Sequence, residues 1–122
     1  MRKVLVVDDD LILLDLLKIM LSGKYEVITA TNGREAVEAY KKYKPDIVLM
    51  DVLMPEMDGI EATRIIKSID PNAKILAITA YAPHKGDEII RAGAMDIIEK
   101  PIKKAELIEK IERYLSKENV IA

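Results

Sequence analysis

The sequence predicts an α/β domain built on a doubly wound, five-stranded parallel sheet with helices on both faces. Two observations support this fold class. Short apolar runs rich in β-branched residues alternate with longer segments of helical period, and the alternation occurs five times along the chain. Each short run is almost continuously apolar, as expected for a strand that is buried on both faces of a parallel sheet.

The five predicted strands are short and are separated by turn-forming residues. Each is four to six residues long, within the usual range for strands of globular proteins. The predicted strands span residues 3–7, 26–30, 46–50, 74–79 and 95–98.

The first predicted helix spans residues 11–22 and stops before Gly23, a residue type that is common just after helix ends. Apolar residues at the spacing i, i+3, i+4, i+7 and i+8 form a sheet-facing stripe: Leu13, Leu16, Leu17, Met20 and Leu21. Four further apolar residues remain on this helix: Leu11, Ile12, Leu14 and Ile19. Some of these must be exposed, so they form either a docking face beside the polar strand ends or ordinary surface.

The second and third helices are predicted over residues 34–43 and 60–69, and the third ends before Pro71 because proline disfavours a helical residue before it. The sheet-facing positions of the second helix are Ala36, Val37 and Tyr40. Those of the third helix are Ala62, Ile65, Ile66 and Ile69. Both assignments follow the helical period.

The fourth helix is predicted over residues 85–92, before Gly93, and it has the fewest apolar positions. The fifth is predicted over residues 103–116, where apolar residues recur at helical spacing: Leu107, Ile108, Ile111, Tyr114 and Leu115. Residues 118–122 are expected to form a frayed tail. The chain thus reads as one domain over residues 1–122, without an output domain of its own.

Composition narrows the classes of partner and compartment. A chain of 122 residues, half of them apolar, can bury a full hydrophobic core. The formal net charge of −2 gives no electrostatic reason to expect nucleic acid or an anionic membrane as a partner. The chain has no cysteine, and no window approaches the apolar length of a membrane span. We therefore expect a soluble, cytoplasmic protein that binds other proteins or small ions.

Acidic residues follow two of the predicted strands. Asp8, Asp9 and Asp10 come directly after the first strand, and Asp51 follows the apolar run of the third. In the 2-1-3-4-5 order of one doubly wound class, ligands bind at the carboxyl ends of the first and third strands, where the winding reverses. Asp8 or Asp9 should therefore lie near Asp51. Carboxylates that share a crevice repel each other, which raises a pKa or requires a cation, and an all-oxygen ligand set suits Mg²⁺.

A hydroxyl and an ammonium group are expected at the same rim. Thr79 ends the fourth predicted strand, and Lys100 comes just after the fifth. With a divalent cation, these groups can stabilise the charge that spreads over a phosphoryl group during in-line transfer. Asp51 would then be the nucleophile, because carboxylates serve as covalent phosphoryl acceptors.

Structural roles are also open to several of these residues. Asp10 is best interpreted as the N-cap of the first helix, whereas the same role for Asp8 and Asp9 would leave Asp51 unexplained. Thr79 could be an ordinary strand-end hydroxyl.

Four further polar or turn residues receive structural interpretations. Asp58 and Gly59 are interpreted as the start of the third helix, with Gly59 permitting a close backbone approach. Lys100 could be a loop charge. The single histidine, His84, is interpreted as a solvated loop residue.

Other functions fit this pattern less well. A phosphatase with an aspartate nucleophile needs a second acid two residues later, where the chain has Leu53. A flavin-binding protein of similar topology needs Gly, Ser and Thr after the first strand, where the chain has three carboxylates.

Four segments resemble the signatures of response-regulator receiver domains. The four occur in the family's order and spacing, which makes coincidence improbable, and the match as a whole extends over almost the entire chain. They are VLVVDDD at residues 4–10, IVLMDVLMPEMDG at 47–59, TAY at 79–81 and EKPI at 99–102. The resemblance implies a (βα)5 flavodoxin-like fold.

The resemblance also implies roles for single residues. Asp51 would be the phosphoacceptor, and Thr79 and Lys100 would contact the phosphoryl group. The bond between Lys100 and Pro101 would be cis, an isomer that is accessible mainly before proline. The implied protein ligands of Mg²⁺ are Asp8, Asp9, Asp51 and the backbone carbonyl of Leu53.

A receiver domain would be a two-component signalling protein, not an enzyme with a separate substrate. Its phosphoryl group would come in trans from a histidine kinase or a phosphotransfer histidine, and the resulting conformational change would control a downstream protein target. The chain could be a chemotaxis-type effector or a phosphorelay intermediate, and a monomer or a weak phosphorylation-dependent dimer. Family members also meet their kinases with the first helix. The alternative is a pseudo-receiver scaffold that acts without phosphorylation.

The sequence departs from the family pattern at one position, and two other positions bear on how fast the phosphoryl group is hydrolysed. Many members have Tyr or Phe three residues before the lysine, where this chain has Ile97. Leu53 and Tyr81, two residues after Asp51 and Thr79, should flank the phosphoryl group. Neither side chain is an acid or amide that would orient an attacking water, so slow hydrolysis is expected.

Overall fold

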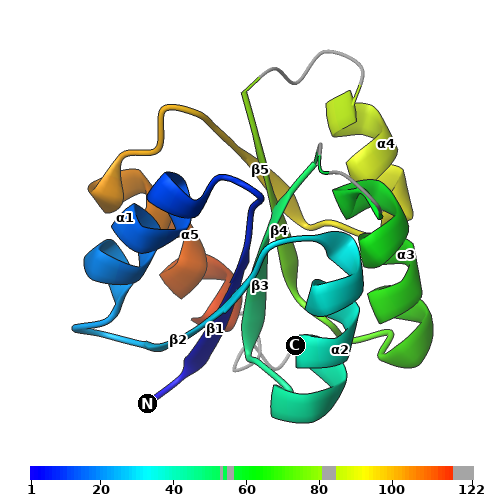
Figure 1. Cartoon of the computed structure of the whole chain (residues 1–122), viewed down its shortest axis with the longest axis horizontal. Coiled ribbons are helices and arrows are strands. Elements are labelled where there is room, and N and C mark those ends of the chain that lie inside the picture. Colours follow the sequence, from blue (N-terminus) through cyan, green and yellow to red (C-terminus); the bar gives the residue numbers. More distant parts are fainter. Residues whose placement is uncertain (53, 55–56, 81–84, 117–122) are drawn as a thin grey trace.

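The structure confirms a five-stranded parallel sheet in the order β2-β1-β3-β4-β5 with helices on both faces (Figure 1). The computed structural model describes residues 1–52, 54, 57–80 and 85–116. The strands are β1 (Lys3–Val7), β2 (Glu26–Ala30), β3 (Ile47–Asp51), β4 (Ile75–Thr79) and β5 (Asp96–Glu99). The helices are α1 (Leu11–Leu21), α2 (Gly33–Tyr43), α3 (Gly59–Ile69), α4 (Lys85–Ala92) and α5 (Lys104–Ser116).

The sheet separates two hydrophobic cores, because successive side chains of a strand point to opposite faces. Leu5 of β1 and Val48 of β3 join the core on the side of α2, α3 and α4. Val4 and Leu49, one residue away in the same strands, join the core on the side of α1 and α5. Figure 1 shows these two groups of helices on opposite sides of the sheet. The continuous apolar runs in the sequence follow from this two-sided burial.

The sheet-facing stripe of α1 differs from the predicted one. The stripe consists of the buried Leu14, Leu17 and Leu21 with the half-buried Leu13 and Met20 at its edges. Leu16, predicted to face the sheet, is 46% exposed, and Leu14, left outside the predicted stripe, is buried. The prediction was wrong because nearly every position of α1 is apolar, so several stripes satisfy the helical period and packing on the sheet selects among them.

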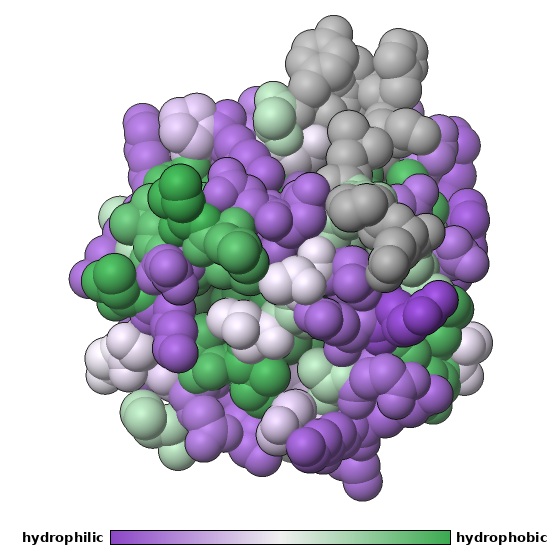
Figure 2. Space-filling view, viewed as in Figure 1, coloured by the Kyte–Doolittle hydropathy of each residue, from purple (hydrophilic) through white to green (hydrophobic). Residues whose placement is uncertain are grey.

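Because Leu14, Leu17 and Leu21 face the sheet, other apolar residues of α1 are left exposed. Four large side chains form this exposed surface, which we call the α1 patch: Leu11, Ile12, Leu16 and Ile19. Ile12 is 82% exposed and Ile19 is 75% exposed. Figure 2 shows apolar side chains gathered on the side of the molecule where α1 lies in Figure 1.

Most other predicted positions are confirmed. The sheet-facing residues of α2 are buried, as are Ala62 and Ile66 of α3 and four of the five predicted positions of α5. Ile69 is 46% exposed, so its predicted inward position was wrong. It is the last residue of α3, where the helix leaves the sheet. Element boundaries differ from the predicted ones by at most one residue, a normal uncertainty at element ends.

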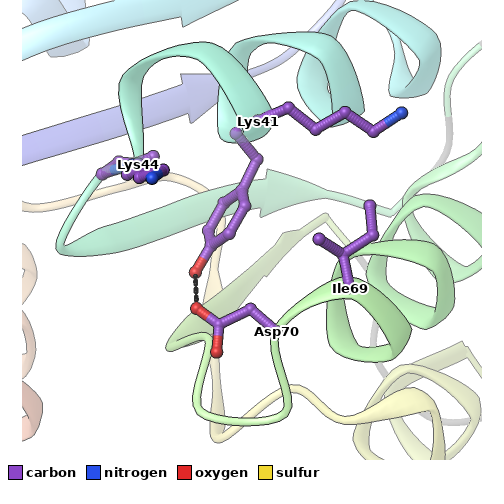
Figure 3. Close-up of a pocket in the computed structure, with 6 residues that line it drawn as sticks. Lys41, Lys44, Ile69 and Asp70 are labelled. Carbon is purple, nitrogen blue, oxygen red and sulfur yellow. Dashed lines mark hydrogen bonds between the residues drawn. The ribbon is translucent and has the colours of Figure 1, made fainter.

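A hollow of about 460 Å³ lies between the carboxyl ends of α2 and α3 (Figure 3). The hydroxyl of Tyr40 donates a 2.7 Å hydrogen bond to Oδ2 of Asp70 there, which ties the two helices together. In this topology the helices run antiparallel to the strands, so the hollow lies at the amino edge of the sheet. It therefore lies away from the carboxyl ends of β1 and β3.

Within the described parts of the chain, no helix is both long and apolar enough to cross a membrane.

Candidate functional site

Three carboxylates meet at the carboxyl ends of β1 and β3. These strands are parallel neighbours with Val7 in register with Met50, so the residues that follow, Asp8 and Asp51, lie side by side. One carboxylate oxygen from each of Asp8, Asp9 and Asp51 lies within 4.8 Å of the others. Asp8 and Asp51 are buried, whereas Asp9 is exposed. The structure thus confirms that the acids following the first and third strands share one crevice.

Lys100 reaches this crevice from the end of β5. Its Nζ lies 3.1 Å from Oδ2 of Asp8 and 3.5 Å from Oδ1 of Asp51. Only 26% of the Lys100 side chain is exposed, so these contacts are shielded from bulk water. Among the described residues, no donor is aligned for a hydrogen bond to the buried Asp8 Oδ2, and its contact with Lys100 is ionic.

The crevice raises the pKa values of Asp51 and Lys100. Burial and the negative charge of Asp8 raise the pKa of Asp51 to about 7, although Lys100 opposes this shift. Burial lowers the pKa of Lys100, but the carboxylates of Asp51 and Asp8 outweigh it and leave this pKa raised. Lys100 is therefore a permanent cation at neutral pH, whereas Asp51 changes charge near neutrality. Such a shifted group beside a specific charge partner is typical of a functional site.

Asp10 has the capping role predicted for it. Its side chain accepts hydrogen bonds from the backbone N–H groups of Ile12 and Leu13, at 3.0 and 3.2 Å. The backbone N–H of Asp10 in turn donates to Oδ1 of Asp8 at 2.9 Å. The third acid of the DDD segment thus begins α1 and orients Asp8.

Thr79 lies at the same rim as Asp51. It is the last residue of β4, and the preceding residue, Ile78, is in register with Asp51. Thr79 is buried, and its carbonyl accepts the backbone N–H of Lys100 at 2.8 Å. The Lys100–Pro101 peptide bond is cis, as the resemblance implied. The structure thus places Asp8, Asp9 and Lys100 around Asp51, and Thr79 at the end of the neighbouring strand.

The start of α3 is packed directly against Asp51. Asp58 caps α3 by accepting the backbone N–H of Glu61 at 2.9 Å. The N–H of Gly59 donates to the carbonyl of Val52 at 2.9 Å. A Cβ added to Gly59 would overlap the Asp51 carbonyl oxygen, far closer than the 3.0 Å that real Cβ atoms respect. The predicted close approach at Gly59 is confirmed.

A second close approach at this rim was not predicted. The N–H of Gly33, the first residue of α2, donates to the carbonyl of Met57 at 3.0 Å. A Cβ added to Gly33 would overlap that carbonyl oxygen. One sequence feature could have indicated this close approach: a glycine directly follows the N-cap Asn32, at a position where helix capping does not require glycine.

Four predicted residues need separate comment. Leu53, Tyr81 and His84 lie outside the described residues. Ile97, at the family's aromatic position, is half-buried in β5 against the core that includes α2, α3 and α4. Its carbonyl accepts a 2.8 Å hydrogen bond from Nζ of Lys110.

The residues present fit a divalent cation. The cluster offers only carboxylate oxygens, the ligand type that Mg²⁺ prefers. When all three acids are ionised, three carboxylates and the Lys100 ammonium leave two negative charges in the crevice. A divalent cation balances that charge.

Comparison with known proteins assigns the family. The model of the response regulator receiver domain matches residues 4–112, a span that contains all four signature segments. The chain belongs to the response regulator receiver domain family. Receiver domains are phosphoacceptor signalling modules of two-component systems and are generally not catalytic enzymes. The acidic cluster of Asp8, Asp9 and Asp51 fits the Mg²⁺ phosphorylation site of this family.

Relatives and solved structures agree over nearly the full length of this receiver domain. It is 48% identical to the chemotaxis protein CheY of Thermotoga maritima over 115 residues, covering 92% of this chain and 96% of the relative. A CheY-like receiver domain from Methanospirillum hungatei has a TM-score of 0.92 at 30% identity, covering 98% of this chain and 97% of that one. The receiver domain of a sensor histidine kinase from Pseudomonas aeruginosa, solved with a magnesium ion in its active-site cleft, has a TM-score of 0.89 at 30% identity and covers 94% and 98%.

Proposed function

We propose that Asp51 of this receiver domain accepts a phosphoryl group from a phosphohistidine of a partner protein. The observation that carries this assignment is the position of Asp51: it is buried at the end of β3 between two other carboxylates and the ammonium of Lys100. A carboxylate oxygen of Asp51 attacks phosphorus, the bond from phosphorus to the histidine nitrogen breaks, and an acyl phosphate forms on Asp51. The imidazole leaves with the electron pair of that bond.

We further propose that Asp8, Asp9 and Asp51 hold Mg²⁺, with the backbone carbonyl of Leu53 as a fourth protein ligand. When bound, Mg²⁺ supplies positive charge that screens the carboxylates and the incoming phosphoryl oxygens from one another. Asp8 and Asp51 are supported for this role by their burial and close approach, and Asp9 by its oxygen in the same cluster. Leu53 rests on the family resemblance alone. The P. aeruginosa receiver domain, with magnesium in its cleft, supports the metal.

Lys100 and Thr79 are proposed as the phosphoryl contacts. Lys100 can exchange its ionic contact with Asp51 for one with a phosphoryl oxygen while it stays near Asp8. Thr79 offers a hydroxyl on the neighbouring strand end. These two residues and the acidic cluster act only on the chain's own Asp51, so the receiver takes part in its phosphorylation and dephosphorylation without turning over another substrate.

The biological setting that we propose is chemotaxis-type signalling in the cytoplasm. The 48% identity to a chemotaxis CheY protein over almost the whole of both chains supports a signal carrier of this type. A histidine kinase or phosphotransfer protein would supply the phosphoryl group, and a downstream protein would bind the phosphorylated form. A monomer, or a weak dimer that forms on phosphorylation, fits such a carrier.

We propose the α1 patch as the surface that meets the phosphodonor protein. Its four apolar side chains lie on the helix that begins two residues after Asp9, beside the acidic crevice. Burial of these side chains against a partner would place the partner's phosphohistidine near Asp51 and remove apolar surface from water.

A phosphotransfer assay tests the proposed function. The purified receiver is mixed with a phosphorylated histidine phosphotransfer domain and Mg²⁺, beside an Asp51→Asn variant. We expect label to move to the wild-type chain only, and hydroxylamine to release it, because hydroxylamine cleaves acyl phosphates. Label on the Asp51→Asn variant, or label on wild type that resists hydroxylamine, would refute the assignment of Asp51.

A further inference from the structure

We propose that Gly33 is a positioning residue for the magnesium and phosphoryl site, acting through Met57 and the start of α3. This inference rests on the proposed function of the Asp8, Asp9 and Asp51 cluster. Gly33 lies outside the four signature segments and outside the acidic crevice. It touches neither Asp51 nor the proposed metal position, so its effect on them must pass through the backbone between them.

The first residue of α2 is in direct backbone contact with Met57. The backbone N–H of Gly33 donates to the Met57 carbonyl at 3.0 Å, and a Cβ at position 33 would overlap that oxygen. The same Cβ would also come within 2.8 Å of Cγ of the Met57 side chain. The overlap with backbone cannot be relieved by a change of rotamer. Only a residue without a side chain allows Met57 to rest on the start of α2.

Met57 is connected to Asp51 through Gly59 at the start of α3. Two residues after Met57, Gly59 donates its N–H to the Val52 carbonyl, and its Cα lies so close to the Asp51 carbonyl that no Cβ fits. Residues 57–59 are therefore held between the first residue of α2 and the last residue of β3. A side chain at position 33 would push this short segment against the backbone of Asp51, or pull it away.

A Mg²⁺ site tolerates little displacement of its ligands. Mg²⁺ requires nearly ideal octahedral geometry with short oxygen distances, whereas overlap of a Cβ at position 33 with the Met57 carbonyl oxygen forces the backbone to shift. A displacement of Asp51 relative to Asp8 and Asp9 would weaken Mg²⁺ binding more than it would weaken the fold. Changes to groups that support metal ligands typically cost roughly tenfold to a hundredfold in metal affinity.

The test compares two alanine variants of the intact chain. Gly33→Ala is the test, and Gly93→Ala is the matched control. Gly93 lies at φ +126° with Lys67 against it, so alanine there also strains the backbone but at the far end of α4. Mg²⁺ affinity is measured by calorimetry, and stability by urea unfolding in EDTA. We expect the Kd for Mg²⁺ to rise about tenfold in Gly33→Ala and to stay within about twofold of wild type in Gly93→Ala.

Equal Kd values in Gly33→Ala and wild type would overturn the positioning role. Equal weakening in both variants would also overturn it, because the loss would then follow stability alone. If wild type itself binds no Mg²⁺, the proposed metal site fails, a result distinct from either of these.

A measurement on wild-type protein covers the case in which Gly33→Ala does not fold. In a titration followed by nitrogen-15 NMR, Mg²⁺ should shift the amide resonances of Gly33 and Gly59, because coupling between the metal site and α2 is reciprocal. Gly23 and Gly93 should not shift. A Gly33 resonance that stays fixed while Gly59 moves would show that the segment does not connect the two sites, and would overturn the proposal.

Discussion

The ammonium of Lys100 lies 3.1 Å from Oδ2 of Asp8, closer than the 3.5 Å that separates it from Oδ1 of Asp51. Lys100 is thus bound to the acidic cluster as a whole and not to Asp51 alone. In this position it offsets part of the repulsion among the three carboxylates, as a bound cation would. Lys100 and a cation therefore act on the same negative charge.

Replacement of Lys100 by methionine should strengthen Mg²⁺ binding and weaken phosphorylation. Methionine keeps most of the side-chain length but removes a positive charge that competes with the metal for the carboxylates. We expect the Kd for Mg²⁺ at pH 8 to fall by about fivefold to tenfold, since partly shielded charges a few ångströms apart interact by about 1 kcal/mol or more. The rate of phosphorylation by acetyl phosphate should fall, because a phosphoryl contact is lost. The exposed Lys103→Met serves as control, and unchanged or weaker Mg²⁺ binding in Lys100→Met would be evidence against the shared role.

The stability of the metal-free protein should depend on pH through Asp51. The pKa of Asp51 is about 7 in the fold against an ordinary value of 3.8, so the folded state keeps a proton that the unfolded state releases between about pH 4 and pH 7. The free energy of unfolding should therefore fall as pH rises through this range and level off above it. Asp51→Asn removes the effect and should be more stable than wild type at pH 8, on the order of 1–2 kcal/mol. Urea unfolding in EDTA from pH 5 to pH 8.5 measures this, and parallel curves for the two proteins would contradict it.

The sequence was sufficient to predict the fold and most of the site, because both depend on features with short range along the chain. Apolar runs buried on both faces mark the strands, and the polar residue after each run marks the carboxyl edge of the sheet. Asp8, Asp9 and Asp51 could be brought together from strand order alone. The capping role of Asp10 followed from residue type and position.

The features that the sequence did not predict depend on packing between distant segments. The choice between Leu14 and Leu16 on α1 is made by the rotation of the helix on the sheet, which its uniformly apolar sequence leaves open. The contact of Gly33 with Met57 joins residues that are 24 positions apart, and neither has a side chain that signals the other. A glycine in the sequence is compatible with a close backbone contact, but only the folded structure shows which group makes that contact.

Polar substitutions in the α1 patch should separate docking from chemistry. Ile12→Ser with Ile19→Ser changes two side chains that are 82% and 75% exposed, so stability should change by no more than about 0.5 kcal/mol for each. Phosphorylation by acetyl phosphate, which needs no docking, should be unaffected. Transfer from a histidine phosphotransfer domain that phosphorylates wild type should slow by about tenfold. Ile90→Ser, at an exposed apolar residue of α4, is the matched control. Full transfer activity in the α1 variant would exclude the patch as the donor surface.

The phosphorylated form is predicted to hydrolyse slowly. Leu53 and Tyr81, by their positions two residues after Asp51 and Thr79, offer no acid or amide to orient an attacking water. Leu53→Asn combined with Tyr81→Glu should therefore accelerate dephosphorylation, by about tenfold or more if one water is oriented. Loss of labelled phosphate after removal of the donor gives the rate. An unchanged decay rate in a variant that still becomes phosphorylated would show that these positions do not control lifetime.

The most direct test of the central claim is the intact mass of the protein after incubation with Mg²⁺ and acetyl phosphate. Two controls accompany it, the Asp51→Asn variant and wild type in EDTA. We expect one added phosphoryl group on wild type with Mg²⁺ and none in either control. A folded wild-type protein that gains no phosphoryl group, or an adduct that persists in Asp51→Asn, would contradict the assignment of Asp51 as the phosphoacceptor.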